Sequence, residues 1–163
     1  MAATEASTDR VRRTTADYRL VRGETETYRE DLLVRLCGEV GLRAVEIPRV
    51  RPVDLFEERE GAGRFLVVRG ADGGEGSRRE AFVPAGVASD LFKYVESNDI
   101  DETDPVVDLS ARRVQMLVGE VAERAAATHD RPDLAEVTPS VLRQFFARRL
   151  LREQGVNPGV VLS

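Results

Sequence analysis

The chain has 163 residues, of which 42% are hydrophobic and 33% are charged, so it is long enough to bury the core of one globular domain. It contains no run of about 18 apolar residues and no basic-then-apolar leader after Met1. This excludes a membrane-spanning helix and a signal segment, and predicts a soluble, cytoplasmic protein without a membrane partner. The net charge of −5 excludes a protein that coats nucleic acid indiscriminately, so any contact with DNA has to be local.

Basic and metal-ligating residue types are unevenly represented in this chain. Lys93 is the one lysine among 24 basic residues, an arginine bias that, with the acidic excess, is typical of a GC-rich, haloarchaeal-like source. Cys37 and His129 are the single cysteine and the single histidine, so the chain cannot form a disulfide framework or a Cys/His zinc site. We expect no metal ion and no small-molecule cofactor, and we expect Cys37 to be a small buried residue on an apolar helix face.

The first part of the chain predicts helices separated by turns. Residues 1–26 are polar and weakly periodic, which predicts a weakly ordered lead-in. Thr27 and Glu30 form a capping-box pattern, and the apolar residues that follow recur at helical spacing, so a buried helix begins here. Gly41 is suited to the left-handed position that ends a helix. Residues 42–47 predict a second short helix, ended by the prolines that follow.

The middle of the chain predicts a small antiparallel sheet and a helix. Residues 64–68 and 79–83 are rich in β-branched and aromatic residues and flank a glycine-rich loop at residues 70–76, which is a hairpin pattern. This loop lacks the lysine of a phosphate-binding loop, so a hairpin tip is the better interpretation. Residues 86–97 then carry apolar side chains at helical spacing. The acidic stretch 99–104 lacks the glycine of a calcium loop.

The last third predicts two more helices. Ser110 is a good cap for an amphipathic helix, and residues 129–136 form a polar connection. Thr138, followed by proline, caps a helix that turns its apolar residues inward and its arginines largely outward until Gly155 ends it. Residues 157–158 begin one further helix. Together these elements predict an α+β, mostly α fold with a small antiparallel hairpin or sheet at its edge.

Three segments, in the right order and spacing, resemble the catalytic domain of the tyrosine recombinase, or phage integrase, family. Gly41-Leu-Arg43, with a glutamate three residues further on, resembles the first arginine motif of that family. Arg79-Glu-Ala-Phe-Val-Pro84 resembles the end of its β-hairpin, and Thr138-Pro-Ser-Val-Leu-Arg143 resembles its His-x-x-Arg helix. The resemblance covers residues 29–163 and implies an integrase-like catalytic core at residues 27–163 that lacks its C-terminal end.

In that family two arginines bind one DNA phosphate, and the resemblance assigns this role to Arg43 and Arg143. Planar guanidinium groups match the geometry of phosphate oxygens and stabilise the charge of the transition state. Ser140 stands where the family usually has a histidine, so the resemblance places it among the catalytic residues. The residues that we expect to bind DNA phosphate are Arg43, Arg69, Arg78, Arg79, Arg143 and Arg148.

The nucleophile and the acid of the family's reaction have no counterpart in this chain. Tyr18, Tyr28 and Tyr94 all precede Arg143, and no tyrosine follows it. Ser140 can hydrogen-bond a phosphate, but it cannot act as a general acid or base near neutral pH as histidine does. The family often uses a lysine of the β-hairpin as the acid, and the arginines at this place in the present chain are poor proton donors. We therefore expect a degenerate recombinase domain, a pseudoenzyme that does not cleave DNA alone.

Three hypotheses of different classes remain open. The first is a truncated recombinase domain that binds duplex DNA, in the context of DNA recombination or integration, without cleaving it. The second is an active half-site that receives its tyrosine from another polypeptide. The third is a non-catalytic helical interaction protein with arginines on its surface.

The position of the two arginines distinguishes the first hypothesis from the third. In the first, the guanidinium groups of Arg43 and Arg143 lie within roughly 10 Å of each other and face one cavity, with the hairpin arginines above it. In the third, they point to unrelated solvent. The apolar residues 160–162 are a surface that self-association or a completing polypeptide would cover.

Overall fold

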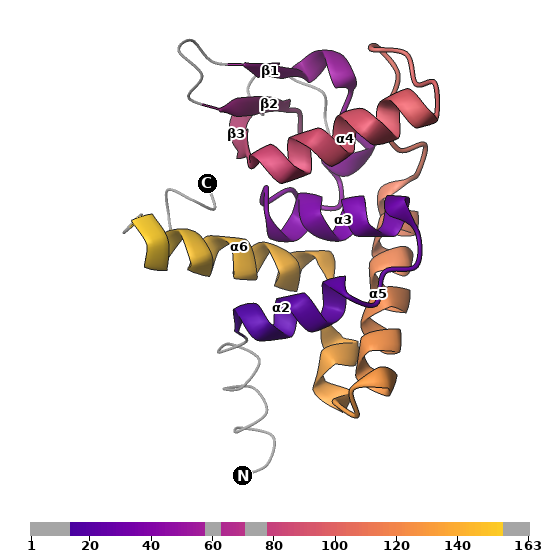
Figure 1. Ribbon diagram of the computed structural model, residues 1–163, viewed down its shortest axis with the longest axis vertical. Coiled ribbons are helices and arrows are strands. Elements are labelled where there is room, and N and C mark those ends of the chain that lie inside the picture. Colours follow the sequence, from indigo (N-terminus) through magenta and orange to yellow (C-terminus); the bar gives the residue numbers. More distant parts are fainter. Residues whose placement is uncertain (1–13, 58–62, 71–77, 155–163) are drawn as a thin grey trace.

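Five α-helices and one three-stranded antiparallel sheet form the described part of the chain, residues 14–57, 63–70 and 78–154 of the computed structural model (Figure 1). The helices are α2 (Thr15–Arg22), α3 (Tyr28–Gly38), α4 (Ala85–Ser97), α5 (Ala111–Thr128) and α6 (Pro139–Gln154). The strands are β1 (Leu55–Glu57), β2 (Arg64–Val68) and β3 (Arg79–Val83), in the order β1-β2-β3. The predicted α+β, mostly α class is confirmed.

Helix α3 lies in the middle of the molecule, with the sheet and α4 on one side and α2 and α6 on the other (Figure 1). Thr27 caps it as predicted, because its hydroxyl accepts the N–H of Glu30 at 3.0 Å, while the Glu30 carboxylate accepts the N–H of Glu26 at 2.9 Å. Every residue from Leu32 to Gly38 is buried, including Cys37. Because these residues point in all directions around the helix, α3 has to be covered on every side.

The sheet contains both predicted strands and a third that the sequence analysis did not predict. Strand β2 pairs antiparallel with β1 and with β3. Leu55, Leu66 and Ala81 are partners across the three strands, and all three are buried in the core. The additional strand β1 has three residues, which is too short to produce a recognisable alternation of apolar and polar residues. Most of the predicted glycine-rich hairpin tip falls at residues 71–77, outside the described residues.

Helices α5 and α6 begin where predicted. The hydroxyl groups of Ser110 and Thr138 each accept the backbone N–H three residues further on, at 3.1 and 3.2 Å. The connection between the two helices is not simply polar, which corrects the prediction. Residues Pro132–Glu136 form a 3-10 helix whose Leu134 side chain is buried in the core. The predicted helix end at Gly155 and the segment that follows lie outside the described residues.

Residues 14–26 contribute to the core, which corrects the prediction of a weakly ordered lead-in for this stretch. Thr14 and Asp17 form a capping box that begins α2. Tyr18 and Val21 lie three residues apart on one face of this helix and are buried. A short helix with two large buried side chains is held by tertiary packing, which a weak periodicity in eight residues does not reveal. Residues 1–13 lie outside the described residues.

Residues 42–46 form a turn, and Ile47 begins a 3-10 helix, in place of the short helix predicted at residues 42–47. The Glu46 carboxylate accepts the backbone N–H of Arg43 at 2.7 Å and closes this turn. Two 3-10 helices follow, Ile47–Arg49 and Pro52–Asp54. Their prolines stand in the first turn, where a residue without an N–H loses no hydrogen bond. The prolines therefore belong to new helical turns instead of ending the helix expected before them.

In the part of the chain that the structure describes, none of the helices is long and apolar enough to cross a membrane. Within residues 14–57, 63–70 and 78–154, no group of three or more His, Cys, Asp or Glu side chains is arranged to hold a metal ion.

Candidate functional site

The turn at residues 41–46, which we call the arginine turn, follows directly on the end of α3. Gly41 has a φ of +84°, a left-handed conformation that glycine adopts without strain, as the sequence predicts. The N–H of Leu42 returns to the carbonyl of Leu36 at 2.9 Å, so the chain folds back across the last turn of the helix. The arginine turn is thereby tied to the most buried helix of the molecule.

A buried carboxylate, that of Glu46, holds the arginine turn together. Only 1% of Glu46 is exposed, and its oxygens accept the Arg43 N–H at 2.7 Å, Nη2 of Arg43 at 3.4 Å and Nη2 of Arg79 at 3.0 Å. Burial alone would raise the pKa of this carboxyl, but the hydrogen bonds from the Arg43 backbone and the Arg79 guanidinium lower the pKa below its ordinary value. Glu46 is therefore a charged residue that anchors two arginines.

The Gly41 carbonyl oxygen joins a third arginine to the same place. It accepts Nη2 of Arg79 at 3.2 Å and Nε of Arg143 at 3.1 Å. Arg79 comes from β3 and Arg143 from α6, so three segments far apart in the sequence meet at the arginine turn. We call Arg43, Arg79 and Arg143 the arginine cluster.

The arginine cluster concentrates positive charge at a partly exposed position. Burial, followed by the charge of Arg79, lowers the pKa of Arg143; the Glu46 charge opposes this, and the Arg43 charge adds a smaller lowering effect. The side chains of Arg43 and Arg79 are 50% and 26% exposed, so a ligand can reach the cluster. Three guanidinium groups against one carboxylate leave an excess of positive charge that attracts an anion, and their planar forks suit an oxyanion with several oxygens, such as a phosphate.

The other predicted hairpin arginines, Arg69 and Arg78, flank Arg79 in the sheet or along the chain. Arg69 forms a bidentate pair with the buried Asp54, in which Nη2 contacts Oδ1 at 3.0 Å and Nε contacts Oδ2 at 3.3 Å. Arg78 is exposed immediately before β3. The hairpin therefore contributes Arg79 to the cluster, while Arg69 is directed to Asp54.

The predicted residues of α6 divide between two sides of that helix. Ser140 precedes Arg143 by three residues, which places it on the same side of α6, and its side chain is exposed. Arg148 follows Arg143 by five residues, which turns it to a different side. Arg143 is half-buried and hydrogen-bonded to the arginine turn, so the prediction that the α6 arginines point largely outward is wrong for this residue.

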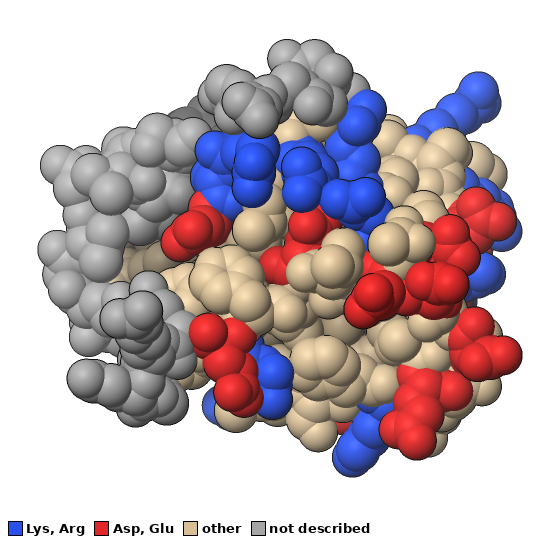
Figure 2. Space-filling model, turned by 90° about the horizontal axis from the view of Figure 1, so that it is seen from above, with Lys and Arg blue, Asp and Glu red and all other residues tan. Residues whose placement is uncertain are grey.

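Charge is unevenly distributed on the end of the molecule that carries the sheet and α4. Figure 2 shows this end, with most of the visible Lys and Arg side chains gathered beside the residues drawn in grey. The Asp and Glu side chains lie mainly toward the opposite side of the view. Such an arrangement gives a protein of net charge −5 a local region that favours anions.

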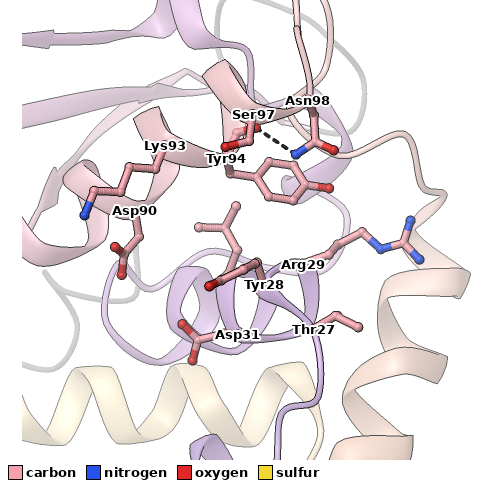
Figure 3. A pocket seen from close by; sticks show the side chains of 10 residues that line it. Thr27, Tyr28, Arg29, Asp31, Asp90, Lys93, Tyr94, Ser97 and Asn98 are labelled. Atoms are coloured by element: carbon pink, nitrogen blue, oxygen red, sulfur yellow. Dashed lines mark hydrogen bonds between the residues drawn. The ribbon is translucent and has the colours of Figure 1, made fainter.

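A hollow of the described residues lies elsewhere, between the start of α3 and the second half of α4 (Figure 3). Its volume is about 690 Å³, and its walls include Tyr28, Tyr94 and Lys93. Its two carboxylates, those of Asp31 and Asp90, both pair with the buried Arg35. The charged residues that line the hollow are two cations, Arg29 and Lys93, and these two carboxylates, so the lining has no excess of positive charge that would favour an anion.

Tyr28 and Tyr94 lie away from the arginine cluster, while Tyr18 lies at the same end of α3 as the cluster, with its ring against Gly38. Tyr18 is buried, its hydroxyl donates to Glu39 at 2.7 Å, and burial followed by the Glu39 charge raises the pKa of the phenol far above its ordinary value. Tyr28 and Tyr94 line the hollow at the start of α3. That helix has 11 residues and is about 16 Å long, and the cluster adjoins its other end.

Two features of this site were not predicted from the sequence. Gly41 was expected to end a helix, but not to be the carbonyl acceptor that Arg79 and Arg143 share. Phe146 is one of the apolar residues expected to face inward on α6, but the contact of its ring with Gly41 was not predicted. The positive φ expected at Gly41 was the available signal, since such a residue presents its carbonyl in a direction that a regular helix does not.

Comparisons with known proteins place this fold. No family model matches the sequence, and no curated protein sequence matches it. Among solved structures, the chain is similar to the crystal structure of XerA recombinase, with a TM-score of 0.68 and 18% sequence identity. The match covers 88% of this chain and 52% of that one, so the chain spans about half the length of the recombinase. The protein therefore has a tyrosine recombinase-like fold.

Proposed function

We propose that the arginine cluster binds a phosphate of duplex DNA and that this chain is a recombinase-like DNA-binding domain that does not cleave DNA alone. The observation that carries the proposal is the meeting of Arg43, Arg79 and Arg143 at one turn. These residues are far apart in the sequence, and random surface arginines would not share a carbonyl and a carboxylate.

The charge balance at the arginine turn supports an anionic ligand. The arginine cluster has three guanidinium groups and one carboxylate, Glu46, which pairs with Arg43 and Arg79, and the lowered pKa of Arg143 reflects burial together with repulsion from the other two arginines. An anion placed between them would reduce this repulsion, because opposite charges at short range favour the ionised forms. A DNA phosphate supplies such an anion together with oxygens that accept bidentate hydrogen bonds.

The positions of the tyrosines support binding without cleavage. Transfer of a phosphoryl group to tyrosine needs a phenol that can reach the bound phosphate and lose its proton. Tyr18 is buried with a raised pKa, and Tyr28 and Tyr94 line the hollow near the opposite end of α3. Ser140 lies on the side of α6 that carries Arg143, where its hydroxyl can donate a hydrogen bond to a phosphate oxygen.

A general interaction role has one observation in its favour. Tyr28 is 89% exposed beside the hollow of Figure 3, and exposed aromatic residues are common at protein interfaces. That hypothesis gives no reason for the arginine cluster to converge. Phosphate binding accounts for the convergence and for the fold, so we favour it.

The test is a titration of duplex DNA at several salt concentrations, followed by fluorescence anisotropy. Replacing Arg43 and Arg143 together by alanine should weaken binding by about 1 to 3 kcal/mol, the size expected for lost charge-assisted hydrogen bonds. The slope of log K against log salt should become shallower by about one unit, because one fewer phosphate is neutralised.

A matched control removes the same charge elsewhere. Arg112 and Arg113 are exposed on α5, so their double alanine variant should leave both the affinity and the salt slope nearly unchanged. Equal losses in the two double variants would refute a specific phosphate site. A nicked substrate tests for a covalent protein–DNA adduct: an adduct with this chain alone would refute the inactive assignment. An adduct that requires a second polypeptide would favour the hypothesis of a tyrosine supplied in trans.

A further inference from the structure

Phe146 of α6 packs against Gly41 of the arginine turn. A Cβ atom added to Gly41 would lie 2.3 Å from Cε1 and 2.4 Å from Cδ1 of the Phe146 ring. These distances are far shorter than a non-bonded contact between two carbon atoms, so the ring fills the space that a Cβ atom at Gly41 would need. With a φ of +84°, the backbone at Gly41 also disfavours every residue that has a Cβ.

The same glycine carries the carbonyl that joins Arg79 and Arg143. Arg143 and Phe146 are three residues apart on α6, so they project from one side of the helix. Helix α6 therefore contacts the arginine turn at two points, with an aromatic ring against the Gly41 backbone and a guanidinium group on its oxygen. Two such points fix both the distance and the orientation of the turn relative to the helix.

A fixed contact is needed because the arginine cluster is repulsive in the absence of an anion. Its members carry like charges, and Arg143 is half-buried, where repulsion is less screened than at the surface. The Gly41 carbonyl compensates part of this repulsion only while it stays between Arg79 and Arg143. An uncharged contact that holds the carbonyl in place, such as the Phe146 ring, does so without adding charge to the site.

We propose that Phe146 and Gly41 are positioning residues of the phosphate site. Their contact sets the position of the Gly41 carbonyl, and through it the positions of the Arg79 and Arg143 guanidinium groups, although neither residue touches the ligand. This inference rests on the proposed function for its effect on DNA, while its geometric part concerns the protein alone.

The neighbouring residue Phe145 offers a matched control. Its ring is buried on a different side of α6, 6.1 Å from the ring of Tyr18 between centroids. Phe145→Leu and Phe146→Leu make the same change at consecutive positions of one helix. Both variants should remain folded, because leucine retains most of the apolar volume. A difference between them therefore reports on the arginine turn rather than on the helix.

The DNA experiment compares these variants at one salt concentration. Phe146→Leu should lower the affinity for duplex DNA by about tenfold, the factor that one displaced hydrogen bond to a charged group would produce, while Phe145→Leu should not. Gly41→Ala should cause at least the same loss. In an Arg143→Ala background, Phe146→Leu should have no further effect, because the group that it positions is gone. An equal loss in both backgrounds would mean that Phe146 acts on stability only, which would overturn the proposal.

A second measurement needs no DNA. The Nε–H resonance of Arg143 can be assigned in a proton–nitrogen NMR spectrum by its disappearance in Arg143→Ala. Phe146→Leu should shift this resonance and accelerate its exchange with water, and Phe145→Leu should leave it in place. An unmoved resonance in Phe146→Leu would refute the positioning role even if DNA binding depends on the arginine cluster. A moved resonance combined with DNA affinity that is indifferent to Arg43 and Arg143 would instead refute the proposed function.

Discussion

Substituting alanine for Gly38 should destabilise the protein, although the same change usually stabilises a helix. Gly38 is the last residue of α3, and a Cβ there would lie 2.3 Å from Cε2 of Tyr18 and 3.0 Å from its Cζ. The Tyr18 ring is only 7% exposed, and its hydroxyl donates to Glu39 at 2.7 Å. The ring therefore cannot move away from a new methyl group without disturbing a buried hydrogen bond to a charged residue.

The size of the effect follows from three contributions. Overpacking of a well-filled core costs about 1 to 3 kcal/mol. Weakening a buried hydrogen bond to a charged acceptor costs about 1.5 to 3 kcal/mol if it is lost completely. Alanine restores about 1 kcal/mol of helix propensity relative to glycine. With the hydrogen bond lost, Gly38→Ala should therefore lower the free energy of unfolding by about 1.5 to 5 kcal/mol.

Urea unfolding followed by circular dichroism measures this difference, and Gly119 supplies the control. Gly119 lies inside α5, where an added Cβ would have no atom within 4 Å outside its immediate surroundings. Gly119→Ala should therefore raise the free energy of unfolding by about 0.5 to 1 kcal/mol. In a Tyr18→Ala background, Gly38→Ala should become neutral or stabilising because the ring is absent. If Gly38→Ala matched Gly119→Ala in the wild-type background, the argument from the Tyr18 contact would be wrong.

Three further predictions concern single buried groups. The pKa of Glu46 is lowered in the folded protein, so its contribution to stability is present above about pH 4.5 and disappears as the pH falls through the folded-state pKa. In urea unfolding between pH 7 and 3, the free energy of unfolding of Glu46→Gln should therefore decrease less with falling pH than that of the wild-type protein. Burial, with a smaller effect of the Glu46 charge, raises the pKa of the Cys37 thiol to about 12. A thiol reagent at pH 8 should consequently modify Cys37 no faster than the protein unfolds, and rapid labelling of the native state would contradict this. Asp54→Asn weakens the bidentate pair with Arg69, so the free energy of unfolding measured in urea should fall by about 1 to 3 kcal/mol. Arg69→Ala should lower the free energy of unfolding by less.

The parts of the fold that the sequence predicted well are those specified by neighbouring residues. The caps at Thr27, Ser110 and Thr138 act over three residues, and the two longer strands contain enough residues to show their β-rich composition. The prediction failed where a distant contact decided the structure. Residues 42–47 have apolar positions compatible with a helix, but the Glu46 side chain binds the Arg43 backbone and Arg79 from another strand holds that carboxylate.

The site shows the same division between local and distant information. The family resemblance singled out Arg43 and Arg143, and the structure brings both to the arginine turn, while their role in phosphate binding stays a prediction. The sequence could not indicate that Arg79 and Arg143 share the Gly41 carbonyl, since this depends on how α6 crosses α3. It likewise could not separate Arg79 from Arg69, because the partner of Arg69, Asp54, comes from a 3-10 helix that only the fold brings close.

The charge of the whole molecule limits what the arginine cluster can do alone. A duplex presents many phosphates, but a chain of net charge −5 repels most of them and attracts DNA at its local basic region. Each phosphate that is neutralised contributes about −0.9 to the slope of log K against log salt, so a site for one phosphate predicts a slope near −1. A slope of that size corresponds to weak binding at physiological salt. Tight binding to DNA would therefore require contacts beyond the arginine cluster, and a much steeper slope measured for this chain would mean that Arg69, Arg78 or Arg148 also reaches the duplex.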